Sequence, residues 1–397
     1  MSEPQSDLIP DDAPPAGIHP PANWLELFYD LVFVAAILVL RSSFAHGHTI
    51  KHGLWITFAF VSIWWIWLAT TMYTNRFRLD DTTHRVLVLL QMFLVALVAM
   101  GAADGIRRDE VFLSIDYALL VGTLAVMYAR GARQGAGPRS FARRRALEYS
   151  AAAVLFLVSA ALPEGIRVSA WIVGFVVTII PAVAYVTSVR PHPPVAEHHL
   201  VERMGAFTLI VCGEAFVKVA IVATNGSLDQ IDVTVMAFQF GLVFAVWWTY
   251  FDDVPLAGLR SSRVAIESWI GGHLALQLSI VGAAIGVSKF VELAPGTHIP
   301  GEEIESVAIP LALFYVALIV IGRCARRRPQ GPLDVLRVVT IALIGLTAVA
   351  TWKIDAVNVT EGVVAMTAIA LVHAAIAGRL RRATTVTRLA LPAQHES

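Results

Sequence analysis

The stretch WLELFYDLVFVAAILVL, from Trp24 to Leu40, decides how the rest of the sequence is interpreted. It is apolar over almost its whole length, as a helix that crosses a membrane must be. It nevertheless carries two acids, Glu26 and Asp30, which lie four residues apart and therefore share one side of a helix. A charged side chain at the centre of a bilayer costs roughly 2.5–3.5 kcal/mol on insertion scales. The stretch therefore predicts a membrane helix whose acidic face is turned toward protein or water.

The composition of the whole chain is that of a polytopic membrane protein. Of its 397 residues, 57% are hydrophobic and 15% are charged, whereas an average soluble domain has about 25% charged residues. The formal net charge is zero, so we expect the lipid bilayer and no nucleic acid as a partner. The arginine-rich stretch RGARQGAGPRSFARRR, residues 130–145, fits the excess of basic residues in cytoplasmic loops.

Apolar runs of about 20 residues predict about twelve spanning helices and an all-α fold. Their approximate bounds are 24–45, 53–73, 86–103, 111–129, 146–162, 166–187, 202–223, 231–251, 267–290, 305–322, 335–353 and 359–378. Arginine is concentrated in alternate loops and after the last run. This pattern places both termini in the cytoplasm and favours an even number of helices.

Four short motifs each occur twice, in the same order. The number of residues between the two copies is nearly the same for all four. The matched positions are Tyr29 and Gly213, Trp64 and Trp247, Gln91 and Gln277, and Ala142 and Ala325. Six helices in each copy would give both copies the same orientation, which is a parallel repeat. We therefore expect a flexible cytoplasmic tail at 1–23, six-helix repeats at 24–190 and 201–382, a linker at 191–200 and a cytoplasmic tail at 383–397.

Polar residues inside the apolar runs are the candidates for a polar cavity or for ion or substrate coupling. They are Glu26, Asp30, Glu202, Arg203, Glu214, Lys218, Asp252, His273 and Gln277. Most of them map to the cytoplasmic third of the membrane, with Glu214 near its midplane. We expect them to line a polar cavity that opens to the cytoplasm and ends at Glu214. Carboxylates and histidine in such a cavity suit proton or cation coupling.

Each of these residues also has a structural interpretation. Glu26 can complement the positive end of a helix dipole, and Asp252 can be a solvated helix end. Glu214 and Lys218 can form an internal salt bridge, because they lie one helical turn apart. His273 can be a hydrogen-bonding residue at a helix contact. The sequence has no recognisable nucleophile motif and no pattern typical of a metal site, so it predicts no catalytic or metal-binding residue and identifies no cofactor.

Three stretches together resemble one known family. They are LELFYDLVFVAAI after a proline-rich lead, HLVERMGAFTLIVCGEAFVKV in mid-chain and WWTYFDD soon after it. In this order they resemble the bacterial low temperature requirement protein A (LtrA) family. The resemblance implies a multi-pass protein of the bacterial inner membrane that is linked to growth in the cold. It implies no agreed biochemical activity.

A more distant resemblance concerns ERMGAFTLIVCGEAF, which is similar to the first helix of bacterial and lysosomal potassium channels that also repeat six helices. Those channels have a Ser-Asp pair after the Phe of their motif, where this chain has Thr208 and Leu209.

Three functional classes remain open from the sequence. The first is a transporter or channel-like protein that moves a small solute or ion and is coupled to protons. The six-helix repeat and the intramembrane charges favour this class. The second is a membrane-embedded enzyme or cofactor-binding protein, which the absence of a catalytic motif disfavours. The third is a stress-adaptation factor without transport activity.

Overall fold

The structure is a computed structural model of the chain. It describes residues 24–42, 50–77, 79–103, 110–135, 138–187, 196–225, 233–254, 258–291, 301–326, 331–354 and 358–390. The expected tail at 1–23 lies outside the described residues, as do residues 191–195 of the expected linker 191–200 and the end of the tail 383–397.

The described residues form twelve α-helices and one 3-10 turn, and they contain no β-strand. The helices are α1 (Trp24–Ser42), α2 (Ile50–Arg76), α3 (Thr82–Ala103), α4 (Glu110–Gln134), α5 (Arg139–Ala160), α6 (Glu164–Thr187), α7 (Glu197–Asn225), α8 (Val233–Asp253), α9 (Arg263–Val291), α10 (Glu305–Arg323), α11 (Gly331–Lys353) and α12 (Val359–Ala390), with the turn η3 (Gly301–Ile304) before α10. The predicted all-helical class is confirmed.

Seven of these helices are long and apolar enough to cross a membrane: α2, α3, α4, α9, α10, α11 and α12. The others include α1 and α7, which carry several of the candidate charges. A helix enclosed by other helices tolerates such charges better than a helix that faces lipid. Large apolar side chains are exposed on the outer helices, for example Phe93 on α3 and Leu346 on α11, as expected of surfaces that face lipid.

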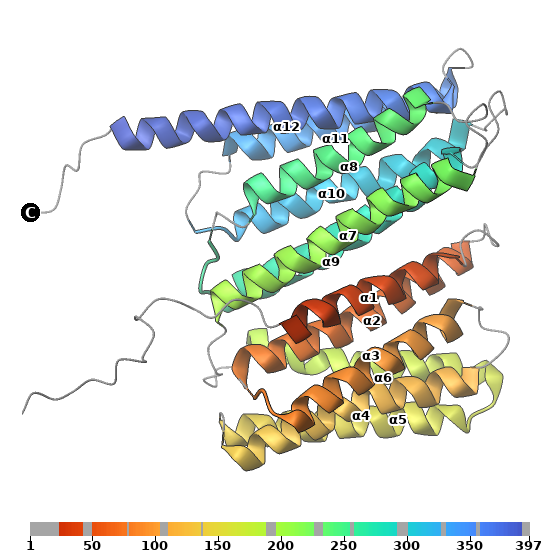
Figure 1. Cartoon of the computed structure of the whole chain (residues 1–397), viewed down its shortest axis with the longest axis vertical. Coiled ribbons are helices and arrows are strands. Elements are labelled where there is room, and N and C mark those ends of the chain that lie inside the picture. The colour runs from red at the N-terminus through yellow and green to blue at the C-terminus, as the bar shows by residue number, and fades with distance from the viewer. Residues whose placement is uncertain are drawn as a thin grey trace, which may run out of the picture.

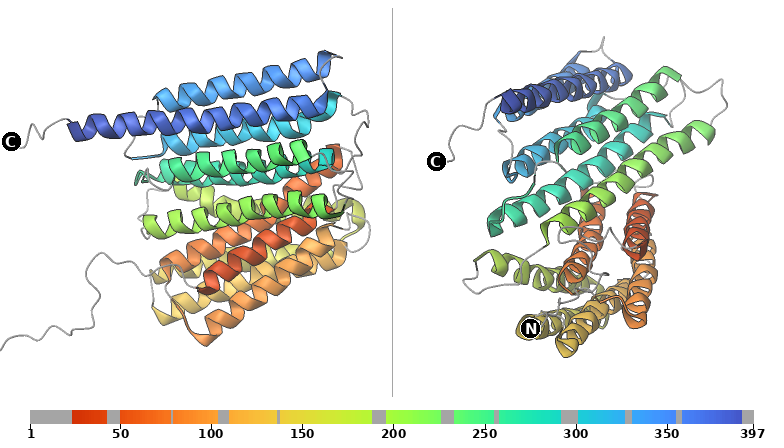
Figure 2. Two further views of the ribbon diagram at one scale, coloured as in Figure 1. Left: turned by 45° about the horizontal axis from the view of Figure 1, so that its top comes forward. Right: turned by 60° about the vertical axis from the view of Figure 1, so that its left-hand side comes forward.

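The helices lie roughly along one common direction, with α1–α6 on one side of the molecule and α7–α12 on the other (Figure 1). Consecutive helices pack in a similar order on both sides. On the first side α1 packs on α3, α3 on α4, α4 on α5 and α5 on α6, and on the second side α7 packs on α9, α9 on α10, α10 on α11 and α11 on α12. The two sides meet where α1 contacts α7, α2 contacts α7 and α9, and α6 contacts α9 (Figure 2).

One close contact from each side shows how its helices pack. In the first, Trp171 of α6 contacts Phe58 of α2, Tyr117 of α4 and Phe156 of α5, with ring centroids 4.8–5.3 Å apart. In the second, α9 approaches α10 through glycine. A Cβ on Gly286 would lie 2.2 Å from the backbone oxygen of Ser306, so only glycine allows this approach.

Candidate functional site

Two acid–base contacts join α1 to α7, one helical turn apart. Glu26 Oε2 lies 3.2 Å from His199 Nε2, and Asp30 Oδ1 lies 2.7 Å from Arg203 Nη2. Moving four residues along α1 corresponds to moving four residues along α7, so the two helices run in the same direction. We call these two contacts the interface pairs.

The Asp30–Arg203 pair is enclosed by protein. The Asp30 side chain is 0% exposed and the Arg203 side chain 2%. Trp67 of α2 donates its indole N–H to the same Asp30 oxygen at 2.6 Å, and its ring packs on Phe207 of α7 with centroids 4.3 Å apart. Within the part of the chain that the structure describes, Asp30 Oδ2 and the Nε and Nη1 atoms of Arg203 have no hydrogen-bond partner. The pair is therefore tightly enclosed but incompletely satisfied.

The Glu26–His199 pair lies nearer the end of the helices and is less enclosed, with side chains 16% and 22% exposed. Asn75, near the end of α2, fixes the start of α7 beside this pair. Its amide donates to the Ala196 carbonyl at 3.0 Å and accepts from the Ala196 N–H at 2.8 Å. The Asn75 amide nitrogen also lies 3.3 Å from His199 Nδ1. The interface pairs thus become more buried from Glu26 to Asp30.

Gln277 of α9 continues the polar contacts between the two sides. It accepts a hydrogen bond from the indole N–H of Trp64 on α2 at 2.6 Å. It also donates to Thr208 Oγ1 on α7 at 3.0 Å. Gln277 is fully buried, and both ends of its amide are satisfied. It therefore ties α2 and α7 to α9.

His273 lies one turn before Gln277 on α9 and is also fully buried. Its Nδ1 is 2.8 Å from the Trp269 carbonyl, and its Nε2 is 3.1 Å from the Tyr250 hydroxyl. Because a carbonyl only accepts, the first contact places a proton on Nδ1, and in the neutral ring Nε2 then accepts from Tyr250. These contacts are those of a residue that joins two helices.

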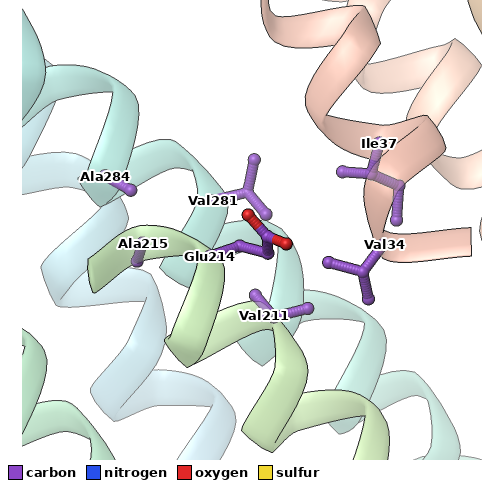
Figure 3. A pocket seen from close by; sticks show the side chains of 7 residues that line it. All are labelled: Val34, Ile37, Val211, Glu214, Ala215, Val281 and Ala284. Carbon is purple, nitrogen blue, oxygen red and sulfur yellow. The ribbon is translucent and has the colours of Figure 1, made fainter. Parts of the chain in front are cut away.

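Glu214 borders a small hollow between α1, α7 and α9 (Figure 3). Its carboxylate lies among Val34 and Ile37 of α1 and Val281 of α9. About 270 Å³ of atom-free space, open solvent included, lies in and around the hollow. Among the described residues that line it, Glu214 is the only charged one. We call it the Glu214 hollow. It continues the α1–α7 contact beyond the interface pairs.

The polar cavity that we expected between the cytoplasm and Glu214 stays a prediction. On α7 the buried residues between Arg203 and Glu214 include the apolar Phe207 and Val211 and also the polar Thr208, which accepts a hydrogen bond from Gln277. Trp67 covers Phe207.

The remaining candidates lie elsewhere. Glu202 is partly exposed beside His198, 4.0 Å away. The side chain of Lys218 lies outside the described residues, so its expected salt bridge with Glu214 stays a prediction. Asp252 belongs to a separate cluster on α8 and α12, where it pairs with Arg381 at 3.2 Å.

Comparison with known proteins identifies the family of this chain. The model of the bacterial low temperature requirement A protein (LtrA) family matches residues 21–378. The chain belongs to the LtrA family. It is also similar to the uncharacterized protein RA0937 of Rhizobium meliloti (strain 1021), with 25% identity over 280 residues, which cover 67% of this chain and 68% of that protein. The resemblance drawn from the sequence is confirmed.

The matched part of this LtrA chain includes site residues that sequence reasoning missed. His199 was not a candidate, although it precedes Arg203 by one turn just as Glu26 precedes Asp30. Trp67 was not a candidate either. The spacing of His199 was a usable signal, whereas nothing in the sequence connected Trp67 to Asp30.

A second buried charge cluster of the LtrA chain was also missed. Arg337 of α11 is 1% exposed; it pairs with Asp253 at the end of α8 and, at 2.9 Å, with Asp334. Arg381 of α12 lies 3.6 Å from Asp253. Among the residues that the structure describes, no group of three or more His, Cys, Asp or Glu side chains could hold a metal ion.

Proposed function

We propose that this LtrA-family protein is a transporter or channel-like protein that moves a small solute or ion across the bacterial cell membrane in exchange with, or together with, protons. In this proposal all twelve helices span the membrane, both termini are cytoplasmic, and the path follows the contact between the two six-helix sides. The membrane-spanning apolar helices and the arginine-rich alternate loops support the topology.

The proposal treats residues 24–190 and 201–382 as two like-oriented units joined by the linker 191–200. Corresponding helices pack in a similar order on both sides, which supports a repeat of either orientation. The interface pairs also make α1 and α7 run in the same direction, whereas corresponding helices of an inverted repeat would run in opposite directions.

The buried Asp30–Arg203 pair is the observation that carries the proposal. Replacing a buried ion pair with apolar residues is often neutral or stabilising, so stability alone explains such a pair poorly. Ionisable residues inside a membrane commonly mark ion or proton pathways. This pair lies where the two units meet, which is where transporters built from repeats bind their substrates.

The atoms of the pair that lack a hydrogen-bond partner indicate how the pair would couple to protons. A proton or small cation that binds Asp30 Oδ2 weakens the attraction between Asp30 Oδ1 and Arg203. That change acts on the contact between α1 and α7 and thus on the relation of the two units. The Glu26–His199 pair lies between this point and the helix ends, and it would pass the proton to or from the cytoplasm, because a histidine ring nitrogen can both accept and donate a proton.

Uptake by proteoliposomes tests this function. Vesicles containing the protein are exposed to a panel of labelled alkali cations and small organic solutes, with and without a pH gradient. We expect a pH-dependent flux of at least one solute, and we expect Asp30→Asn combined with Arg203→Met to abolish it while the protein remains folded. Asp80→Asn, which removes one partner of the exposed pair with Arg85, is the matched control and should leave the flux unchanged. An active, folded double variant would refute the coupling role of the pair.

The topology is tested separately with reporter fusions. Fusions after residues 140, 226 and 328 should report the cytoplasm, the outside and the cytoplasm. A fusion after residue 140 that reports the outside would contradict the proposed orientation. The family description further connects the protein to a low-temperature requirement, so we propose that its transport supports growth in the cold. Deletion of the gene should slow growth at low temperature, and the Asp30→Asn, Arg203→Met double variant should fail to restore it.

A further inference from the structure

A second hollow lies between α7, α8 and α9, next to the Glu214 hollow, and shares Ala215 and Ala284 with it. About 380 Å³ of atom-free space, open solvent included, lies in and around it. Apart from Gln239 of α8 and Cys212 of α7, its lining side chains are aliphatic. We call it the Gln239 hollow. None of the contacts that carry the proposed transport function involves Gln239 or Cys212.

Gln239 is a buried polar group that its surroundings satisfy poorly. The residue is 0% exposed. Its amide nitrogen lies 3.5 Å from the Val287 carbonyl, which is longer than the usual hydrogen-bond range of about 2.7–3.2 Å. Its amide oxygen has no hydrogen-bond partner among the described residues. An unsatisfied buried polar atom costs free energy, so a hydrogen-bond donor that reaches this oxygen from the hollow would stabilise the protein.

The buried amide of Gln277, unlike that of Gln239, has hydrogen-bond partners for both its oxygen and its nitrogen. Gln277 is equally buried, yet its oxygen accepts from Trp64 and its nitrogen donates to Thr208. The fold thus satisfies one buried membrane amide fully and leaves the oxygen of another open beside a hollow. The difference is that tightly packed helices surround Gln277, whereas aliphatic walls with space between them surround Gln239.

We propose that the Gln239 hollow binds a small apolar molecule that carries one hydrogen-bond donor, such as a medium-chain alcohol. The hydrocarbon part contacts the aliphatic walls, which include Leu242 and Ile280. The hydroxyl group donates to Gln239 Oε1. Such a ligand fits these walls better than water does, because a buried water needs two to four polar partners and the lining side chains here supply a single amide. A fully apolar molecule of the same size fills the space but leaves the amide oxygen unsatisfied.

Cys212 provides a reporter inside the hollow. The chain has two cysteines, Cys212 and Cys324. In a Cys324→Ser variant, Cys212 is the sole thiol, and it lines the hollow. A ligand in the hollow blocks access to the thiol, so the rate at which a small maleimide alkylates Cys212 reports occupancy.

The experiment compares 1-hexanol with hexane on the purified Cys324→Ser protein and on the same protein with Gln239→Met. We expect saturating 1-hexanol to slow alkylation of Cys212 about tenfold or more, hexane to slow it much less, and Gln239→Met to abolish the difference between the two probes. Equal protection by both probes in both proteins would show that Gln239 contributes nothing and would overturn the proposal. Absence of protection by either probe would overturn it as well.

Two provisions cover the cases in which the thiol reacts too slowly or the Gln239→Met variant does not fold. If the Cys212 thiol reacts too slowly to follow, the thermal unfolding midpoint of the Cys324→Ser protein replaces it, and 1-hexanol should raise this midpoint more than hexane does. If Gln239→Met fails to fold, the comparison of the two probes on the Cys324→Ser protein still decides. This test measures binding alone, so its outcome does not depend on whether the protein transports a solute.

Discussion

The substitution Asp30→Asn isolates the charge of the buried interface pair. Asparagine has nearly the size of aspartate, and its Oδ1 atom can still accept the hydrogen bond that Trp67 donates to Asp30 at 2.6 Å. What the substitution removes is the negative charge 2.7 Å from Arg203 Nη2. It leaves the guanidinium, on a side chain only 2% exposed, without a counter-charge at that position.

The magnitude follows from the distance and the burial. At 2.7 Å and an effective dielectric constant of about 20, two unit charges attract each other by about 6 kcal/mol. Part of this attraction is offset, because the asparagine avoids the desolvation cost of the carboxylate. Removing one partner of a buried ion pair typically destabilises a protein by about 3–5 kcal/mol, and we expect Asp30→Asn to fall in this range.

Unfolding by sodium dodecyl sulfate in mixed micelles, followed by helical circular dichroism, measures the change in the free energy of unfolding. Asp80→Asn is the matched control, because the Asp80 and Arg85 side chains are 48% and 59% exposed and exposed pairs contribute at most about 1 kcal/mol. Adding Arg203→Met to Asp30→Asn removes the unpaired charge, so the double variant should regain most of the lost stability. If Asp30→Asn unfolds like Asp80→Asn, or if the double variant is as unstable as the single one, the reasoning is refuted.

Three other predictions follow from described contacts. Arg337→Met should lower the free energy of unfolding by about 3–5 kcal/mol, because Arg337 is buried between two acids. Arg323→Met is the control and should lower it by less than about 1 kcal/mol, since Arg323 pairs with the same Asp334 but is 70% exposed. Equal losses would contradict the role of burial. Gly286→Ala should destabilise by about 1–3 kcal/mol or more through its clash with α10, while Gly271→Ala, which has open space, should be neutral or stabilising in the same unfolding assay. Glu214→Gln should leave the protein folded but abolish solute uptake by proteoliposomes, and an unchanged flux would remove Glu214 from the proposed path.

The candidate site could be predicted from the sequence in part. Intramembrane acids are costly in lipid, so Asp30 on α1 and Arg203 on α7 stood out as residues that needed partners, and the structure pairs them with each other. Glu214 and Gln277 stood out in the same way, but the structure places Glu214 in an apolar hollow and joins Gln277 to Trp64 and Thr208. Residue type indicated which side chains were unusual, while their contacts depended on how the helices are rotated against one another.

The helix boundaries, like the site, were predicted only in part from the sequence. The apolar run at 146–162 predicted the fifth helix, whereas α5 is Arg139–Ala160 and begins within the arginine-rich stretch. Hydropathy detects the part of a helix that suits the lipid interior. It does not detect the turns that continue beyond it, where long basic side chains can reach water or partners such as Glu148.

The sequence by itself determined that this is an all-helical chain with apolar runs long enough to span a membrane, and it determined which of those runs carry charge. Both properties depend on local composition and on the helical period, which are read along one segment at a time. Only the tertiary structure decided that Asp30 pairs with Arg203, that Trp67 donates to the same oxygen, and that Gln277 joins Trp64 to Thr208. These contacts join segments far apart in the chain, and the packing of whole helices fixes them, because no single segment specifies which face of a neighbour it will meet.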